Sequence, residues 1–300
     1  MASPTSSQPT ERLLGLLDAF ARMTHQALLS GPERTEALNA ARAFLERLGF
    51  EPDRFHAIPV GFFADCATLR RRLEEAGYSA EEIEASELVA DSRLDGRLVG
   101  PIRDPEGCIR SFWARHPSDT RPPYLFKGRW KEELGAVGLE VAYPAVRLGR
   151  APLVLVEALF DALLIQSLGF PNIAAIGGSA AHMSRERWQR LALWGVRRVM
   201  LVPSATESGH RDARVALKNA ARAQPAPQVA LVAPARLGRY RTAGDLVRGA
   251  GLGAFRAILE PLGPDPPTPQ RTPPPPPQQR PRRGYCSLHQ CDETDCFCFD

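Results

Sequence analysis

An alternation of apolar runs, polar turns and helical stretches constrains this chain more than any other feature of its sequence. It fills residues 152–221 with three units, PLVLVEALFDALLIQSLGF, PNIAAIGGSAAHMSRERWQRLALWG and RRVMLVPSATESGHRDARVALKNAARA. Each unit pairs a short strand-like run with apolar residues at helical spacing. Residues 228–233 (QVALVA) add another short strand. Strands that alternate with helices in this way predict an α/β fold, with a parallel sheet covered by helices on both faces.

Polar residues follow two of these strands. In parallel sheets, functional residues gather at the carboxyl ends of the strands. Glu157 ends the first strand, and Ser204 to Glu207 follow a later one. Asp161 lies one helical turn after Glu157, whereas Asp212 lies further along its own helix and is expected to point away from the strand ends.

The segment from residue 93 to residue 143 combines cations with aromatic residues. A strand, the turn Asp-Pro-Glu-Gly and a returning strand predict a β-hairpin. Such a composition suits single-stranded nucleic acid, because cations neutralise phosphates while aromatic faces stack on bases. The alternative is that the aromatic residues form the hairpin core and the cations keep an edge soluble. The candidate phosphate contacts are Arg97, Arg103, Arg115, Lys127 and Arg129.

Several ordered motifs within residues 40–256 resemble one family, the catalytic core of bacterial (DnaG-type) DNA primases with its TOPRIM domain. The resemblance includes Pro101 to Asp104 with Gly107, Tyr124-Leu125, and Glu157 after its strand. Further matches are Gly49, Gly61 to Ala64, Ala76-Gly77, Ser79 to Glu82, Arg115, Gly177 to Ser179, Gly209 and Asp245. Ser79 and Glu82 also have the spacing of a helix-capping box. The resemblance implies a TOPRIM-like parallel sheet preceded by a smaller mixed α+β subdomain.

One departure from that family concerns the metal ligands. Where the family has Asp-x-Asp to hold Mg²⁺, this chain has Ser204-Ala205-Thr206. A hard cation prefers charged oxygen ligands, so Mg²⁺ is expected to bind weakly or not at all. The carboxylates left as candidate catalytic ligands are Glu157, Asp161 and Glu207. A second departure is Pro123, which stands where the family has a Lys before Tyr-Leu.

The resemblance therefore implies a single-stranded nucleic-acid-binding protein of replication or of a mobile element, with a degenerate metal site. The expected partners are a single-stranded DNA or RNA template and a replicative helicase or another replication protein. One alternative is an active primase that makes RNA primers, or a nuclease, with a Mg²⁺ site rebuilt from Glu157 and Glu207. Another is a non-catalytic structural adaptor.

The end of the sequence is rich in potential metal ligands. Cys286, His289, Cys291, Cys296 and Cys298 lie within thirteen residues, and four of them would close a Zn²⁺ site. The alternatives are disulfides or a disordered thiol tail. The expected organisation is a tail with an amphipathic helix (1–38), a primase-core-like subdomain (39–150), a TOPRIM-like domain (151–260), a disordered Pro-rich linker (261–284) and this Cys/His-rich tail (285–300).

Charge and hydropathy narrow the class of protein. The formal net charge of +4 permits nucleic-acid binding without demanding it. No apolar run approaches the roughly 20 residues of a membrane span, and the first residues, MASPTSSQPTER, lack the pattern of a secretory signal. A cytoplasmic protein without a membrane segment is the expectation.

Overall fold

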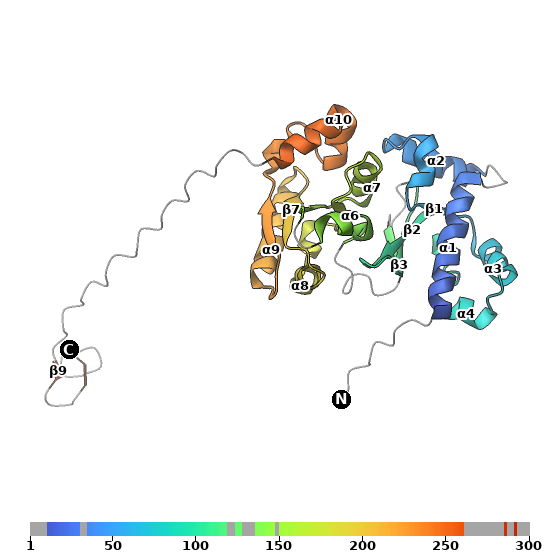
Figure 1. Ribbon diagram of the computed structural model, residues 1–300, viewed down its shortest axis with the longest axis horizontal. Helices are drawn as coiled ribbons and strands as arrows, with labels where there is room; N and C mark the ends of the chain where they lie inside the picture. Colours follow the sequence, from blue (N-terminus) through green and yellow to red (C-terminus); the bar gives the residue numbers. More distant parts are fainter. Residues whose placement is uncertain are drawn as a thin grey trace. The chain divides into compact units, whose positions relative to one another are not determined.

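A computed structural model describes residues 11–30, 35–118, 124–127, 136–147 and 150–260, together with the backbone of 285–286 and 291–292. Residues up to Leu259 form one compact unit with two four-stranded sheets (Figure 1). The fold is mixed α/β, as the sequence predicted. None of the helices in the described ranges combines the length and apolarity that crossing a membrane requires.

The first sheet is antiparallel, in the order β1-β2-β3-β4. Its strands are β1 (Gly61–Phe63), β2 (Arg97–Arg103), β3 (Ile109–Arg115) and β4 (Tyr124–Lys127). β2 and β3 form the predicted hairpin. The helices of this part are α1 (Glu11–Ser30), α2 (Glu36–Arg47), η1 (Pro52–Ala57), α3 (Cys66–Glu75), α4 (Ala80–Ala85) and η2 (Ser92–Leu94). α4 begins with the predicted capping box of Ser79 and Glu82.

The second sheet is parallel, in the order β6-β5-β7-β8. Its strands are β5 (Leu153–Val156), β6 (Ile173–Ala175), β7 (Arg198–Val202) and β8 (Gln228–Leu231). They are the four strands that the hydrophobic runs predicted. The accompanying helices are α6 (Leu139–Val146), α7 (Leu159–Ser167), η3 (Ala180–His182), α8 (Arg185–Leu193), α9 (Glu207–Arg222), η4 (Pro234–Leu237) and α10 (Ala243–Leu259).

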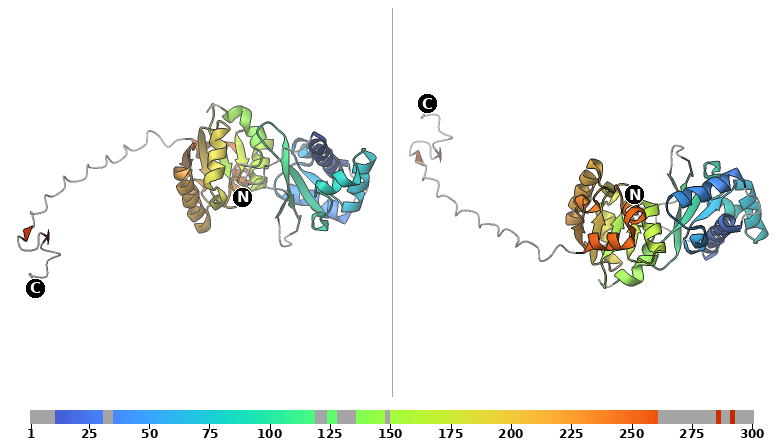
Figure 2. Two further views of the ribbon diagram at one scale, coloured as in Figure 1. Left: turned by 90° about the horizontal axis from the view of Figure 1, so that it is seen from below. Right: turned by 90° about the horizontal axis from the view of Figure 1, so that it is seen from above.

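Helices cover both faces of this sheet (Figure 2). Alternate side chains of a strand point to opposite faces, so β5 contributes to two clusters of buried residues. Val154 and Val156 pack with residues of α7 and α10. Leu153 and Leu155 pack with residues of α6, α8 and α9. Burial on both faces explains why β5 and β6 are continuously apolar instead of alternating with polar residues, whereas β8 at the edge is largely exposed.

A shared core joins the two sheets. Trp113 of β3 is fully buried, and its ring meets Phe160 of α7 edge to face, with 5.4 Å between ring centroids. Gly100 of β2 makes room for this indole, because a Cβ at that position would overlap the Trp113 ring and the Pro59 carbonyl oxygen. The same cluster contains Leu98 and Ile102 of the hairpin together with Val156 of the parallel sheet.

Removing the Trp113 side chain should therefore destabilise both sheets together. We expect Trp113→Ala to lower the free energy of unfolding by about 3–5 kcal/mol, because it leaves a large cavity between β3 and α7. The matched control is Leu193→Ala on α8, whose side chain is 71% exposed and should cost no more than about 0.5 kcal/mol. Urea denaturation followed by fluorescence and by circular dichroism measures both. Similar losses in the two variants would contradict a shared core.

Candidate functional site

Glu157 connects two loops at the carboxyl end of the parallel sheet. It directly follows β5, and its carboxylate accepts two backbone hydrogen bonds, one per oxygen. Oε1 accepts from the Ala180 N–H and Oε2 from the Ser204 N–H, both at 2.9 Å. The Glu157 carbonyl oxygen also accepts from the Gly178 N–H at 3.2 Å. Glu157 thus holds the loop after β6 and the loop after β7 against the end of β5.

A chain of hydroxyl groups follows β7 at the same edge of the sheet. Ser204 Oγ lies 3.2 Å from Thr206 Oγ1, which lies 3.0 Å from Ser208 Oγ. Thr206 also caps α9, because its Oγ1 accepts from the Gly209 N–H at 3.0 Å. A side chain at 209 would overlap Ser204, so this close turn requires glycine. The hydroxyl groups serve the local fold and carry no charge for a cation.

Asp161 turns toward α10 and does not line the pocket beside Glu157. Its side chain is buried, with 6% exposure. Burial raises the pKa of the Asp161 carboxyl, although hydrogen bonds from the Gly244 backbone and the Thr242 hydroxyl oppose the rise. A Cβ at Gly244 would overlap this carboxylate. Asp161 therefore acts as an anchor between α7 and the start of α10.

The second acidic residue at the pocket is Asp212, and the expectation that it points away was wrong. Its carboxylate accepts a hydrogen bond from Ser179 Oγ, and both residues line the pocket with Glu157. The reason is helical periodicity: Gly209 faces the sheet, so Asp212, three residues later, lies on the same side of α9. Glu207, the predicted substitute ligand, is exposed at the start of α9 and does not line the pocket.

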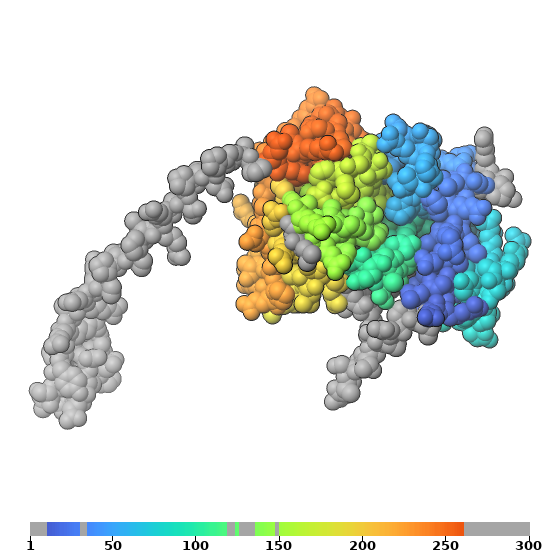
Figure 3. All heavy atoms as spheres, in the orientation of Figure 1, coloured from blue at the N-terminus to red at the C-terminus, as the bar shows by residue number. Residues whose placement is uncertain are grey.

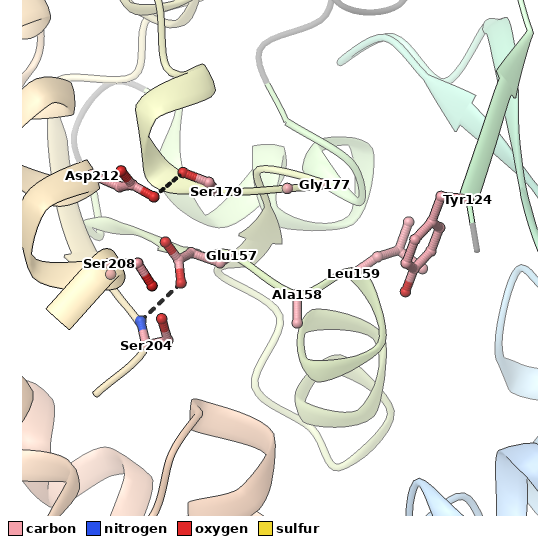
Figure 4. Close-up of a pocket in the computed structure, with 11 residues that line it drawn as sticks. Tyr124, Glu157, Ala158, Leu159, Gly177, Ser179, Ser204, Ser208 and Asp212 are labelled. Atoms are coloured by element: carbon pink, nitrogen blue, oxygen red, sulfur yellow. Dashed lines mark hydrogen bonds between the residues drawn. The ribbon is translucent and has the colours of Figure 1, made fainter. Parts of the chain in front are cut away.

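The pocket has a volume of about 310 Å³ and is bounded by both sheets (Figure 4). The loops after β5, β6 and β7 form most of its wall, and Tyr124 of β4 faces them from the antiparallel sheet. The Arg115 guanidinium lies over the Tyr124 ring, 5.2 Å from its centroid, and over Phe44 at the same distance. A cation stacked on an aromatic ring therefore borders the pocket.

Of the five predicted phosphate contacts, the three whose side chains the structure describes do not line one common pocket. Arg97 is buried at 5% exposure and donates from Nε to the Arg93 carbonyl oxygen. Arg103 donates to the Gly107 carbonyl oxygen and pairs with Asp18 of α1, where it lines a different pocket. Arg115 lies over Tyr124, which lines the pocket beside Glu157, and its Nη1 donates to the His116 and Ser118 carbonyl oxygens. The Lys127 side chain and Arg129 lie outside the described residues.

The sequence predicted two sets of metal ligands, and the structure describes the side chains of only the first set. Within the described residues, no three His, Cys, Asp or Glu side chains are grouped so that they could hold a metal ion. Glu157, Asp161 and Glu207 are thus not brought together. For the predicted Zn²⁺ tail, the backbone of β9 (Tyr285–Cys286) pairs antiparallel with β10 (Cys291–Asp292), which places Cys286 opposite Cys291. His289, Cys296 and Cys298 lie outside the described residues, so the zinc site stays a prediction.

The proteins that this chain resembles in sequence and in structure are DNA primases. No family model matches the chain. A DNA primase of Pseudomonas putida (strain KT2440) is 30% identical over 198 residues, which cover 61% of this chain and 29% of the relative. The chain thus spans less than a third of that relative's length.

Solved structures extend the likeness to most of the chain. The crystal structure of a DNA primase domain from Pseudomonas aeruginosa matches with a TM-score of 0.65 and 26% identity, and the match covers 82% of this chain and 77% of that one. A DnaG primase catalytic domain bound to single-stranded DNA matches with a TM-score of 0.62 and 20% identity, covering 83% of this chain and 78% of that one. The second likeness shows the fold alone.

The geometry of Glu157 makes a prediction about its role. Glu157→Gln should lower the free energy of unfolding by about 1–3 kcal/mol, because one side-chain oxygen becomes an NH₂ group that faces a backbone N–H. Glu207→Gln is the matched control: it loses only a charge at an exposed helix start, for about 0.3–1 kcal/mol. Thermal unfolding measures both variants. An equal, small effect would mean that the two backbone hydrogen bonds do not hold the loops.

Proposed function

We propose that this chain, which carries a bacterial DnaG-type primase-like domain, binds single-stranded nucleic acid in replication or in a mobile element without making primers. Its parallel sheet would be a TOPRIM-like domain whose metal site has degenerated. The proposal rests on the residues that follow β5 and β7 and on the groups to which they are hydrogen-bonded. Glu157 uses both oxygens on backbone N–H groups, and Ser204 and Thr206 present hydroxyls where cation binding needs carboxylates.

The residues at the pocket do not fit the Mg²⁺ site that the family implies. Mg²⁺ gives up its hydration water reluctantly and is held by charged oxygen ligands and substrate phosphates. Here each oxygen of Glu157 already accepts a hydrogen bond from a backbone N–H, of Ala180 or of Ser204, so only its remaining lone pairs are left for a cation. Asp161, turned to Thr242 and Gly244, offers no second charge there.

Nucleic-acid binding is supported by the stacked pair at the edge of the pocket. Arg115 can neutralise a phosphate while the Tyr124 ring, partly exposed, offers a face to a base. Such a combination of cation and aromatic ring is typical of sites that hold single strands without reading their sequence. The matched catalytic domain solved with single-stranded DNA supports the same class of ligand.

An active enzyme is the second candidate, and Asp212 is the observation that favours it. Glu157 and Asp212 line the same pocket, and one or two carboxylates with substrate phosphates can suffice for Mg²⁺. Primer synthesis on a single-stranded template that Asp212→Asn abolishes would establish this candidate. Absence of both synthesis and binding at low salt would leave the structural adaptor.

The binding proposal predicts distinct effects of two changes at Tyr124. Tyr124→Leu should weaken binding of a fluorescent single strand about 5-fold or more, since stacking on one base contributes about 1–3 kcal/mol. Tyr124→Phe is the matched control and should bind nearly as the wild type, because it keeps the ring. Arg115→Ala should also flatten the salt dependence by about 0.7 in slope. Fluorescence anisotropy over a salt series measures all three variants. Equal affinities of the Leu and Phe variants would show that no base stacks on Tyr124.

Restoring the two acidic residues tests the degenerate metal site. Ser204→Asp with Thr206→Asp should raise Mg²⁺ affinity at least about 10-fold, because two charged oxygen ligands return to the strand end. Ser204→Asn with Thr206→Asn is the control of equal shape without charge. Asp and Asn both cap helices well, so α9 should keep its start in both variants. Titration calorimetry measures the affinity, and equal affinities for the two double variants would show that position 204–206 is not the lost site.

A further inference from the structure

Positive charge is concentrated in one part of the sequence. Residues 185–256 contain fourteen Lys and Arg against four Asp and Glu, although the whole chain has a formal net charge of only +4. Two of those four acidic residues, Glu207 and Asp212, belong to α9. Asp212 faces the pocket beside Ser179, so it does not neutralise the outer face of the helix.

Helix α9 has two contrasting faces. Small residues cover the face that packs in the fold, where Gly209, Ala213, Ala216 and Ala220 are buried. The opposite face is cationic. Four exposed side chains recur on it at intervals of three and four residues, and they define the α9 cationic face: Arg211, Arg214, Lys218 and Arg222. α9 packs against α8 and β8 and lies at the surface of the molecule (Figures 1 and 3).

These four cations have no partner among the described residues. None of them forms an ion pair or a hydrogen bond there. Other helices pair their cations, as in Arg71 with Glu75 and Arg248 with Asp245. Like charges three and four residues apart repel each other by about 0.2–0.5 kcal/mol per pair. The arrangement weakens the isolated helix, so an external anion would relieve it.

The composition of α9 indicates which polyanion fits. Sites for single strands combine cations with aromatic rings on which bases stack, and Glu207–Arg222 contains no Phe, Tyr or Trp. In a double helix the base faces are hidden and the phosphates are presented regularly, at about one charge per 1.7 Å of axis. Arg211 and Arg222 are separated by about 16 Å along the helix axis. This length is close to that of half a turn of duplex.

We propose that the α9 cationic face binds the phosphate backbone of double-helical nucleic acid, independently of base sequence. α9 begins at the pocket, where Ser208 and Gly209 form part of the wall, and extends away from it. The α9 cationic face lies on the side of the helix opposite to the buried Gly209 and Ala213, so a duplex on it lies outside the pocket. The contact involves only charge and does not require a base to enter the pocket.

The test compares two double variants of the full chain that change the net charge equally. Arg214→Glu with Lys218→Glu alters the α9 cationic face, and Arg22→Glu with Arg71→Glu alters exposed cations of α1 and α3. The new Glu residues on α9 lie three and four positions from Arg211 and Arg222, and these two favourable pairs offset the repulsion between the Glu residues themselves, so the helix should be preserved. Thermal unfolding verifies that both variants fold. Anisotropy of a fluorescent duplex about two helical turns long is measured over a salt series.

We expect the α9 pair to lose duplex affinity about 10-fold or more and the salt slope to fall by about 2, because each lost phosphate contact removes about 0.9. The α1 and α3 pair should lose less than about 3-fold and keep its slope. Equal losses would overturn the proposal in favour of overall charge, and so would unchanged binding by the α9 pair or no duplex binding by the wild type at low salt.

The α9 proposal rests on the proposed nucleic-acid-binding function, but the α9 site and the single-strand site at Tyr124 can fail independently. Tyr124→Leu is measured on the same duplex and should bind it as the wild type does. If Tyr124→Leu leaves single-strand binding intact while the α9 pair loses duplex binding, the stacking site fails and the α9 site stands. A loss of duplex binding in Tyr124→Leu as large as in the α9 pair would place the duplex in the pocket and overturn the α9 site.

Discussion

A single carboxylate organises the carboxyl end of the parallel sheet. Glu157 accepts the Ala180 and Ser204 N–H groups, one on each oxygen, and so fixes the loops that follow β6 and β7 relative to β5. A backbone N–H without a partner costs about 1–3 kcal/mol where water is excluded. The same side chain that would serve a cation in an acidic site here satisfies the protein's own backbone.

The neighbouring hydroxyl groups are consistent with that account. Thr206 caps α9 and exchanges a hydrogen bond with Ser204, while Gly209 permits the close turn beneath them. The turn after β7 is thus held by residues that are good helix caps. Under the proposed function, the primase-like scaffold would differ from a metal centre at this turn in charge, because Ser204 and Thr206 carry none.

Much of the fold could be predicted because it depends on local patterns. The apolar runs of β5 and β7 and the Asp-Pro-Glu-Gly turn of the hairpin are visible in short windows of sequence. The site could be predicted only in part. The expected orientation of Asp212 was wrong, although a spacing of three residues from Gly209 places both residues on the same side of a helix. The burial of Arg97 and the pairing of Arg103 with Asp18 depend on contacts distant in sequence, which composition does not reveal.

The edge-to-face contact between Trp113 and Phe160 has a consequence for how this chain could be divided. Because the hairpin and the parallel sheet share one apolar interior, neither half presents a surface that tolerates water when the other is absent. A recombination event that separated them near residue 150 would produce two fragments prone to aggregate. The hairpin and the parallel sheet are therefore expected to stay joined in one chain, because each supplies apolar surface that the other needs to bury.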